Sequence, residues 1–184
     1  MIEADSEFIE KIQKEKPDFV FNIAEGLEGP NRESHVPMIL EFLGIPYSHS
    51  DGFALTLSLD KELTKMIARR AGIRTPDSWV IQPAKQDQVL ISRPGPKPFP
   101  IFLKPLREGS SKGIRMSSVV KNRKELESEC ARLWQNYGNI PLLAEQYVRG
   151  REITVGVLGT KNPKIIGTME IRWQEKEKRR GDFV

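Results

Sequence analysis

Short apolar runs alternate with amphipathic segments along this chain of 184 residues. A short apolar run is typical of a buried strand, whereas apolar residues three and four positions apart are typical of a helix. The stretch "DFVFNIAEG" at 18–26 predicts a buried strand that enters a loop. Two amphipathic helices are expected next, one through Val36, Ile39, Leu40 and Leu43 with Ser34 at its N-cap, and one through Leu59, Leu63, Met66 and Ile67. This alternation predicts an α/β fold.

The second half of the chain follows a proline-rich stretch at 92–100, which we expect to be an exposed connection. Strands are expected at 100–104 and near Ile114. A helix is expected from about residue 122 to 137, with a capping box of Asn122 and Glu125 and with Cys130 on its apolar stripe. Three further apolar runs predict an antiparallel meander, at 141–148, 151–159 and 164–172.

Composition argues against several classes of protein. The net charge is only +4 with 29% charged residues, and part of the excess comes from "KEKRR" at 176–180, so a nucleic-acid partner is not favoured. A single cysteine cannot form an internal disulfide and fits a reducing compartment. The sequence has no apolar run long enough to span a bilayer, and its N-terminus is acidic where a signal peptide is basic. We expect a soluble, cytoplasmic protein without a membrane partner.

The loop after the strand at 100–104 carries the first sign of chemistry. Lys104 ends that strand, and the small residues Gly109, Ser110, Ser111 and Gly113 follow. The loop matches neither the Walker pattern nor the dinucleotide fingerprint. Its backbone N–H groups and hydroxyls are nevertheless suited to wrapping an anion. An ordinary mobile hairpin loop is the alternative.

Three charged residues elsewhere give weaker signs. If its helix begins at Ser58 or Asp60, Lys61 lies in the first turn, where the helix dipole disfavours a cation by about 0.3–1 kcal/mol and a bound anion would reverse the effect. A solvated lysine is the alternative. Glu145 and Glu152 bracket "EQYVRGRE", and strand carboxylates can accept hydrogen bonds from ribose hydroxyls or a base amino group. Each glutamate alone could equally be a surface residue.

The order of these segments is more specific than any one of them. "LDKELTK" at 59–65, "IFLKPLREGSSKG" at 101–113 and "AEQYVRGREITVGVLG" at 144–159 together resemble the D-alanine–D-alanine ligase family of the ATP-grasp superfamily. The upstream "FNIAEGLEG" and "LEFLGIPYSHSD" resemble the end of that family's N-terminal domain. The resemblance implies a mixed α/β and α+β ATP-grasp fold. It divides the chain into a partial N-terminal α/β domain (1–75), a small central α+β lobe (76–150) and the start of a C-terminal lobe (151–184).

The resemblance also implies an ATP site. Lys61 and Lys104 would neutralise the phosphates, and the loop from Gly109 to Gly113 would close over them. Ser110 would act as the catalytic residue near the γ-phosphate and the substrate, with Ser111 beside it. The remaining contacts would be the backbone of Gln146 and Val148 at the adenine edge, Glu145 and Tyr147 nearby, and Glu152 on the ribose.

The reaction implied is an ATP-dependent carbon–nitrogen ligation that proceeds through an acyl phosphate and uses Mg²⁺, as in peptidoglycan biosynthesis. The partners implied are small amino-acid substrates and a second copy in a homodimer. The family's opening strand with its substrate-binding glutamate has no counterpart here. Its magnesium ligands, an aspartate and a Glu-x-Asn pair, lie beyond the third meander strand, so no metal ligand is expected in this chain. We therefore expect a fragment that binds ATP weakly and does not ligate alone.

Glu25 departs from the family pattern on the substrate side. D-alanine ligases usually show a histidine followed by glycines after the corresponding strand, whereas this chain has Ala24, Glu25 and Gly26. Glu25 is the candidate substrate-binding residue, and it brings negative charge to that position. D-alanyl-D-alanine is thus one candidate product among several. A ligase for a different amino acid, or a noncatalytic nucleotide-binding or regulatory module, is the alternative.

Overall fold

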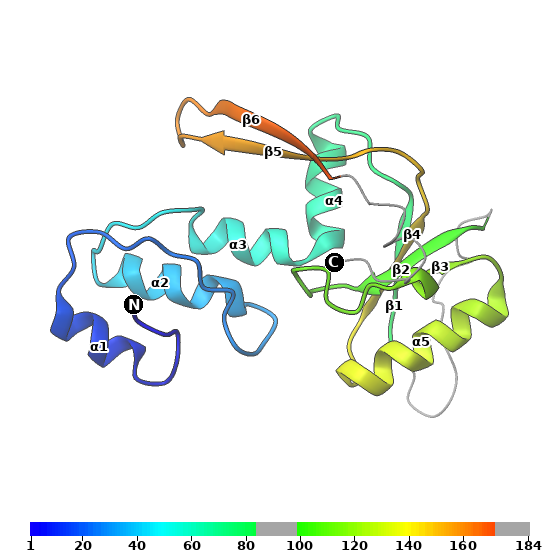
Figure 1. Ribbon diagram of the computed structural model, residues 1–184, viewed down its shortest axis with the longest axis horizontal. Helices are drawn as coiled ribbons and strands as arrows, with labels where there is room; N and C mark the ends of the chain where they lie inside the picture. Colours follow the sequence, from blue (N-terminus) through cyan, green and yellow to red (C-terminus); the bar gives the residue numbers. More distant parts are fainter. Residues whose placement is uncertain (84–98, 172–184) are drawn as a thin grey trace.

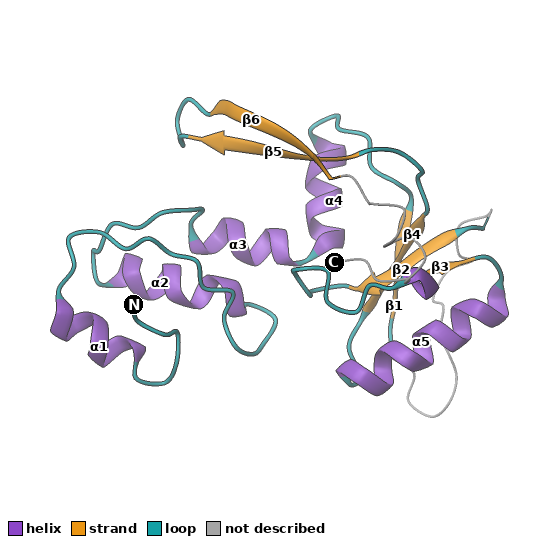
Figure 2. Ribbon diagram, viewed as in Figure 1, coloured by secondary structure: helices purple, strands orange, loops and turns teal. Residues whose placement is uncertain are grey.

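The computed structural model describes residues 1–83 and 99–171, as a helical N-terminal part, a sheet covered by a helix, and a separate β-ribbon (Figures 1 and 2). The helical part contains α1 (Phe8–Glu15), α2 (His35–Phe42), α3 (Gly52–Leu59) and α4 (Lys61–Arg70). A short 3₁₀ turn, Arg32–Ser34, precedes α2. In the described ranges, no helix has the length and apolar character needed to cross a membrane.

Helices α1 and α2 share a small core. Phe8 and Ile12 from α1 pack with Val36 and Leu40 from α2, as the helical spacing of these residues predicts. Ser34 lies at the N-cap of α2 as expected, but its hydroxyl donates to the Asn31 carbonyl at 2.8 Å and caps no helical N–H. The 3₁₀ turn before α2 explains this difference, because it already ties that end of the helix.

The segment predicted to be a buried strand, 18–26, is extended but only partly covered. Val20 pairs with Tyr47 in an isolated parallel bridge. Phe19, Phe21 and Ile23, which alternate with Val20 and Asn22 along the segment, are exposed. The prediction of a buried strand is therefore wrong. No neighbouring strand covers this side within the described residues.

Aspartates begin the next two helices. Asp51 accepts a hydrogen bond from the Ala54 N–H at 2.7 Å at the start of α3, and Asp60 accepts from two N–H groups of α4 at 3.1 Å each. Of the two starts considered for the second helix, Ser58 and Asp60, the structure has Asp60; Leu59, expected on the same helix, ends α3 instead. The apolar residues Leu63, Met66 and Ile67 of α4 are exposed, whereas Lys65 is buried. The face of α4 that meets the sheet is thus the charged one.

The sheet has the order β1-β4-β2-β3 and is antiparallel throughout. Its strands are β1 (Ser78–Ile81), β2 (Ile101–Pro105), β3 (Val119–Val120) and β4 (Leu142–Gln146). The register places Leu103 opposite Ala144 and Phe102 opposite Glu145. Because strand side chains alternate between faces, Leu103 and Ala144 point to one face, and Phe102, Lys104 and Glu145 point to the other.

Helix α5 (Arg123–Tyr137) covers the apolar face of the sheet (Figure 1). Leu126, Cys130 and Leu133 pack against Leu103 and its neighbours, and Cys130 is fully buried as predicted. The capping prediction is confirmed in part. Asn122 accepts from the Glu125 N–H at 3.0 Å, but the Glu125 carboxylate accepts from the Lys121 N–H instead of the N–H of Asn122.

A two-stranded ribbon, β5 (Glu152–Leu158) and β6 (Lys164–Ile171), forms the rest of the described chain. These strands pair antiparallel as expected, but the predicted meander is wrong because β4 already pairs with β1 on one side and β2 on the other. Ile114 lies in the loop, and the short strand is β3 instead. The proline-rich connection falls largely outside the described residues.

Candidate functional site

Lys61 stands at the first turn of α4, beside the end of β2. Its ammonium group donates to the carbonyls of Leu106, at 3.2 Å, and Glu108. Its backbone N–H also points to the Leu106 carbonyl, at 3.4 Å. Burial, together with the nearby ammonium group of Lys104, lowers the pKa of Lys61 to about 8. Two lysines predicted to meet phosphates therefore lie close enough to repel each other.

Glu145 bridges two lysines on the face of the sheet away from α5. Its Oε1 accepts from Lys104 Nζ and its Oε2 accepts from Lys65 Nζ, each at 2.5 Å. The three side chains retain only 13%, 19% and 10% of their exposure, for Glu145, Lys104 and Lys65 respectively. Burial raises the pKa of Glu145, but the two ammonium groups outweigh it and hold that pKa below its ordinary value.

An aromatic pair extends this surface. The rings of Phe102 and Tyr147 are stacked with 6.3 Å between centroids and 24° between planes, and Lys104 Nζ lies 5.4 Å from the Phe102 centroid. Past the end of β4, Tyr147 donates its N–H to the Pro100 carbonyl at 3.1 Å. Gln146 donates its N–H to the Asp77 carbonyl at 2.9 Å, and Val148 is exposed.

The loop after β2 has an unusual backbone at its two serines. Ser110 and Ser111 have φ angles of 48° and 57°, in the left-handed region that few residues other than glycine adopt. The loop is held by hydrogen bonds from the Lys112 N–H to the Gly109 carbonyl, at 3.0 Å, and from the Ile114 N–H to the Ser111 carbonyl, at 3.1 Å. The loop is therefore a defined turn and not an extended hairpin tip.

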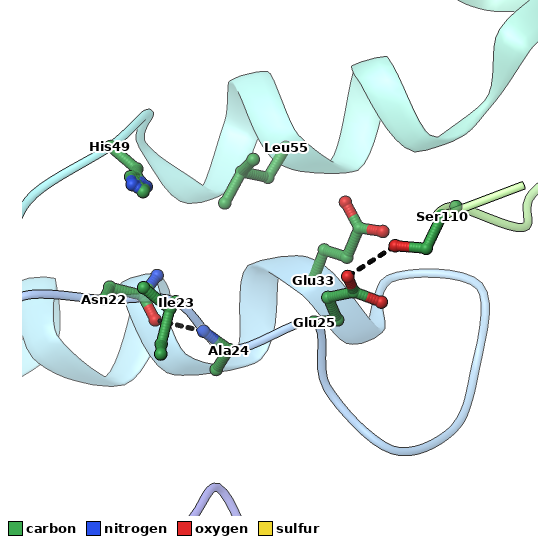
Figure 3. Close-up of a pocket in the computed structure, with 9 residues that line it drawn as sticks. Asn22, Ile23, Ala24, Glu25, Glu33, His49, Leu55 and Ser110 are labelled. Atoms are coloured by element: carbon green, nitrogen blue, oxygen red, sulfur yellow. Dashed lines mark hydrogen bonds between the residues drawn. The ribbon is translucent and has the colours of Figure 1, made fainter. Parts of the chain in front are cut away.

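Ser110 also connects the loop to the N-terminal part. Its hydroxyl donates to Glu25 Oε1 at 2.6 Å, across 85 positions of sequence. Figure 3 shows the cavity that these residues border, with the carboxylates of Glu25 and Glu33 both near Ser110. The cavity has a volume of about 450 Å³, and Asn22 and His49 line its other end.

A buried arginine fixes the same junction. Arg32 donates to the Arg107 carbonyl at 2.8 Å, and its guanidinium lies 3.3 Å from Glu108 and 3.6 Å from Glu33. Arg107 in turn pairs with Asp60, at 2.9 Å, the residue that caps α4. The segment that follows β2 is thus held from the 3₁₀ turn on one side and from α4 on the other.

The structure brings some of the predicted site residues together and not others. Lys61, Lys104 and Glu145 meet around the end of β2, and Glu25 meets the serine loop. Glu152 is exposed at the start of the β5–β6 ribbon and takes part in none of the contacts described above. Lys65 and Arg32 escaped prediction. The only sequence signal for Lys65 is its position four residues after Lys61, which places both on one face of a helix.

Metal ligands are the remaining question at this site. Within residues 1–83 and 99–171, no three His, Cys, Asp or Glu side chains come together in a way that could hold a metal ion. We therefore assign no Mg²⁺ ligand among the described residues and derive no step through that ion.

Comparison with known proteins gives a consistent picture. Residues 68–178 match the family described as D-ala D-ala ligase C-terminus. The D-alanine–D-alanine ligase of Rhizorhabdus wittichii is 32% identical over 164 residues, which are 87% of this chain and 49% of that protein. The crystal structure of VanG D-Ala:D-Ser ligase from Enterococcus faecalis aligns with a TM-score of 0.69 and 25% identity, over 83% of this chain and 43% of that chain. That of D-alanine–D-alanine ligase from Bacillus anthracis complexed with ATP aligns with a TM-score of 0.63 and 25% identity, over 95% and 58%. The chain spans about half the length of the curated relatives it matches.

Proposed function

Because the chain belongs to the D-alanine–D-alanine ligase family, with its ATP-grasp fold, we propose that it binds ATP and forms part of an ATP-dependent carbon–nitrogen ligase. The observation that carries the proposal is the pair of ammonium groups at Lys61 and Lys104, whose mutual repulsion helps to lower the pKa of Lys61. A polyphosphate between them would remove that repulsion.

The rest of the nucleotide has a place in the same proposal. The adenine lies against the end of β4, where Gln146 has already given its N–H to Asp77 and so meets the base through its carbonyl. The Val148 N–H and the Glu145 carboxylate complete the polar edge, and the Phe102–Tyr147 pair supplies an apolar wall. The ribose is assigned to Glu152. Gly109, Ser110 and Ser111 cover the phosphates.

The chemistry proposed for the whole protein has two steps. The carboxylate of the first amino acid attacks the γ-phosphorus of ATP, which gives an acyl phosphate and ADP. The amine of the second amino acid then attacks the acyl carbon, and inorganic phosphate leaves. The residues described here contribute alignment and charge neutralisation, which dominate catalysis of phosphoryl transfer. Ser110 serves the γ-phosphate and the reacting carboxylate.

Titration of the 184-residue chain with ATP tests the assignment. The variant Lys104→Ala removes a charge-assisted contact and is expected to weaken ATP binding about tenfold or more. Lys124→Ala, on the exposed side of α5, is the matched control and is expected to bind like the unaltered chain. Equal binding by all three proteins would refute the phosphate role of Lys104.

A ligase and a noncatalytic nucleotide-binding module differ in turnover. Release of inorganic phosphate and ADP that depends on added amino acid identifies a ligase. ATP that is bound with the same dependence on Lys104 but stays intact when amino acids are added fits a noncatalytic module, and it also fits the partial ligase expected from the sequence.

The residues that line the cavity support a second candidate function, a ligase of the same kind that acts on a different amino acid. Glu25 and Glu33 both face the cavity, so an amino acid with an additional cationic group fits it better than D-alanine does. D-lysine is therefore expected to bind the chain in the presence of ATP more tightly than D-alanine. Glu25→Gln and Glu33→Gln are each expected to reduce that preference. Tighter binding of D-alanine by the unaltered chain would exclude this substrate class.

A further inference from the structure

Lys65 is a buried lysine on α4, and it is not among the residues that line the cavity. It lies one helical turn after Lys61 on α4, and its ammonium group contacts Glu145 Oε2 at 2.5 Å. A lysine is seldom buried unless it is paired, and only 8% of this residue is exposed. The position therefore calls for an explanation other than solubility.

The geometry creates a conflict at Lys104. Its ammonium group is held on Glu145 Oε1 at 2.5 Å, so a phosphate on the side away from the sheet would have to draw it off that carboxylate. When Lys104 leaves, the Glu145 carboxylate stays in a largely buried position. A buried carboxylate that loses its partner is strongly destabilising, so the departure of Lys104 would be opposed if it were the only partner.

Lys65 resolves this conflict because it is a second partner from a different element. With Lys65 in place, Glu145 keeps an ammonium group at 2.5 Å after Lys104 has moved. Together the three side chains carry a net charge of +1. Without Lys65, the charges of Glu145 and Lys104 cancel, and the carboxylate attracts Lys104 without competition.

We propose that Lys65 is a positioning residue, which neutralises Glu145 so that Lys104 is free to bind the phosphates of ATP. The inference rests on the proposed function, since it requires ATP to be the ligand of Lys104. Lys65 acts through Glu145 and has no contact with the nucleotide itself.

Binding measurements with a double substitution test this role. Lys65→Met is expected to weaken ATP binding about tenfold, because Glu145 then retains Lys104. Glu145→Gln added to Lys65→Met removes the competing charge and is expected to restore most of the affinity. Glu145→Gln alone provides the reference for any direct effect on the adenine. Lys65→Arg keeps the charge and is expected to bind ATP nearly as well as the unaltered chain.

Adenosine binding distinguishes the proposed role of Lys65 from a purely structural one, which would affect adenosine and ATP binding alike. Adenosine has no phosphates, so Lys65→Met is expected to leave adenosine binding unchanged while it weakens ATP binding. Circular dichroism melting checks that each variant is folded. If Lys65→Met does not fold, Lys65→Gln replaces it and keeps a polar group at the buried position.

The outcomes separate this inference from the proposed function. If the unaltered chain binds ATP, Lys104→Ala does not, and Lys65→Met binds normally, the role of Lys65 is refuted while the proposed function stands. If the double variant binds no better than Lys65→Met, Lys65 does not act through Glu145 and the inference is likewise refuted. If the unaltered chain binds no ATP, both fall.

Discussion

The environment of Lys61 disfavours its positive charge. It sits in the first turn of α4, where the helix dipole opposes a cation, and it is partly buried near Lys104. Two carbonyl groups, of Leu106 and Glu108, offset this by accepting its hydrogen bonds. The two carbonyls thus accept the hydrogen bonds that phosphate oxygens would accept in the proposed complex.

The lowered pKa of Lys61 predicts a pH dependence of ATP binding. In the free chain that pKa is about 8, and a bound phosphate favours the protonated form and raises it. Binding above pH 8 is therefore coupled to proton uptake. Affinity is expected to be level between about pH 7 and 8 and to fall by up to about tenfold per pH unit above it. Calorimetric titrations from pH 7 to 9.5 measure this.

Lys61→Met is the control for this dependence. It is expected to bind ATP weakly, with an affinity that no longer falls through this pH range. A decline of equal slope in both proteins would assign the titration to another group.

The sequence drew attention to some residues of the candidate site and not to others, for a physical reason. Lys61, Lys104 and Glu145 stand in segments whose order and spacing resemble a known family, and the comparisons confirm that resemblance. Their roles stay predictions. Lys65 and Arg32 were missed because a buried charge is defined by its partners, which come from segments 80 and 75 positions away in the sequence.

At the scale of elements, local signals located several helices and strands but did not predict how the strands pair. The helix from Arg123 to Tyr137 and the strands β2 and β4 lie where the sequence pattern predicted them. The predicted meander failed because β4 pairs with β1 and β2 from earlier in the chain. Strands that are consecutive in the sequence are expected to pair with each other. No local feature of the sequence indicates that β4 pairs with an earlier strand on both of its sides.

The N-terminus of α5 offers a stability test at this scale. Asn122→Ala removes the side chain that accepts from the Glu125 N–H at 3.0 Å. The change is expected to lower the free energy of unfolding by about 1 kcal/mol and the melting temperature by about 2–4 °C. Asn122→Asp keeps the capping oxygen and is expected to cost less. Equal melting temperatures for the alanine variant and the unaltered chain would show that the cap adds no stability.

Across the whole molecule, burial is distributed very unequally. The antiparallel sheet and α5 enclose the largest core, whereas nearly every residue of the β5–β6 ribbon is exposed on both faces. An isolated two-stranded ribbon is marginally stable in water.

Three predictions about the whole molecule stay predictions. They are the division into 1–75, 76–150 and 151–184, the homodimer and the cytoplasmic location.

This contrast predicts different rates of hydrogen exchange. Amides of β5 and β6 are expected to exchange at least about 100-fold faster than those of β2 and β4, because the ribbon opens without disturbing the core. Exchange followed by mass spectrometry on peptides from 152–171 and from 101–105 and 142–146 measures the difference. Similar protection in both regions would show that the ribbon is stabilised by contacts beyond its own pairing.

The burial of Cys130 allows opening of the core to be followed by chemical labelling of this residue. It is the single cysteine in the sequence, its surface is fully covered, and burial raises the pKa of its thiol to about 12. Alkylating reagents attack the thiolate, so the folded protein is expected to resist labelling at neutral pH. Labelling therefore requires α5 to open from the sheet, and where closing is faster than alkylation the labelling rate measures the population of that open state. No probe has to be introduced by mutation.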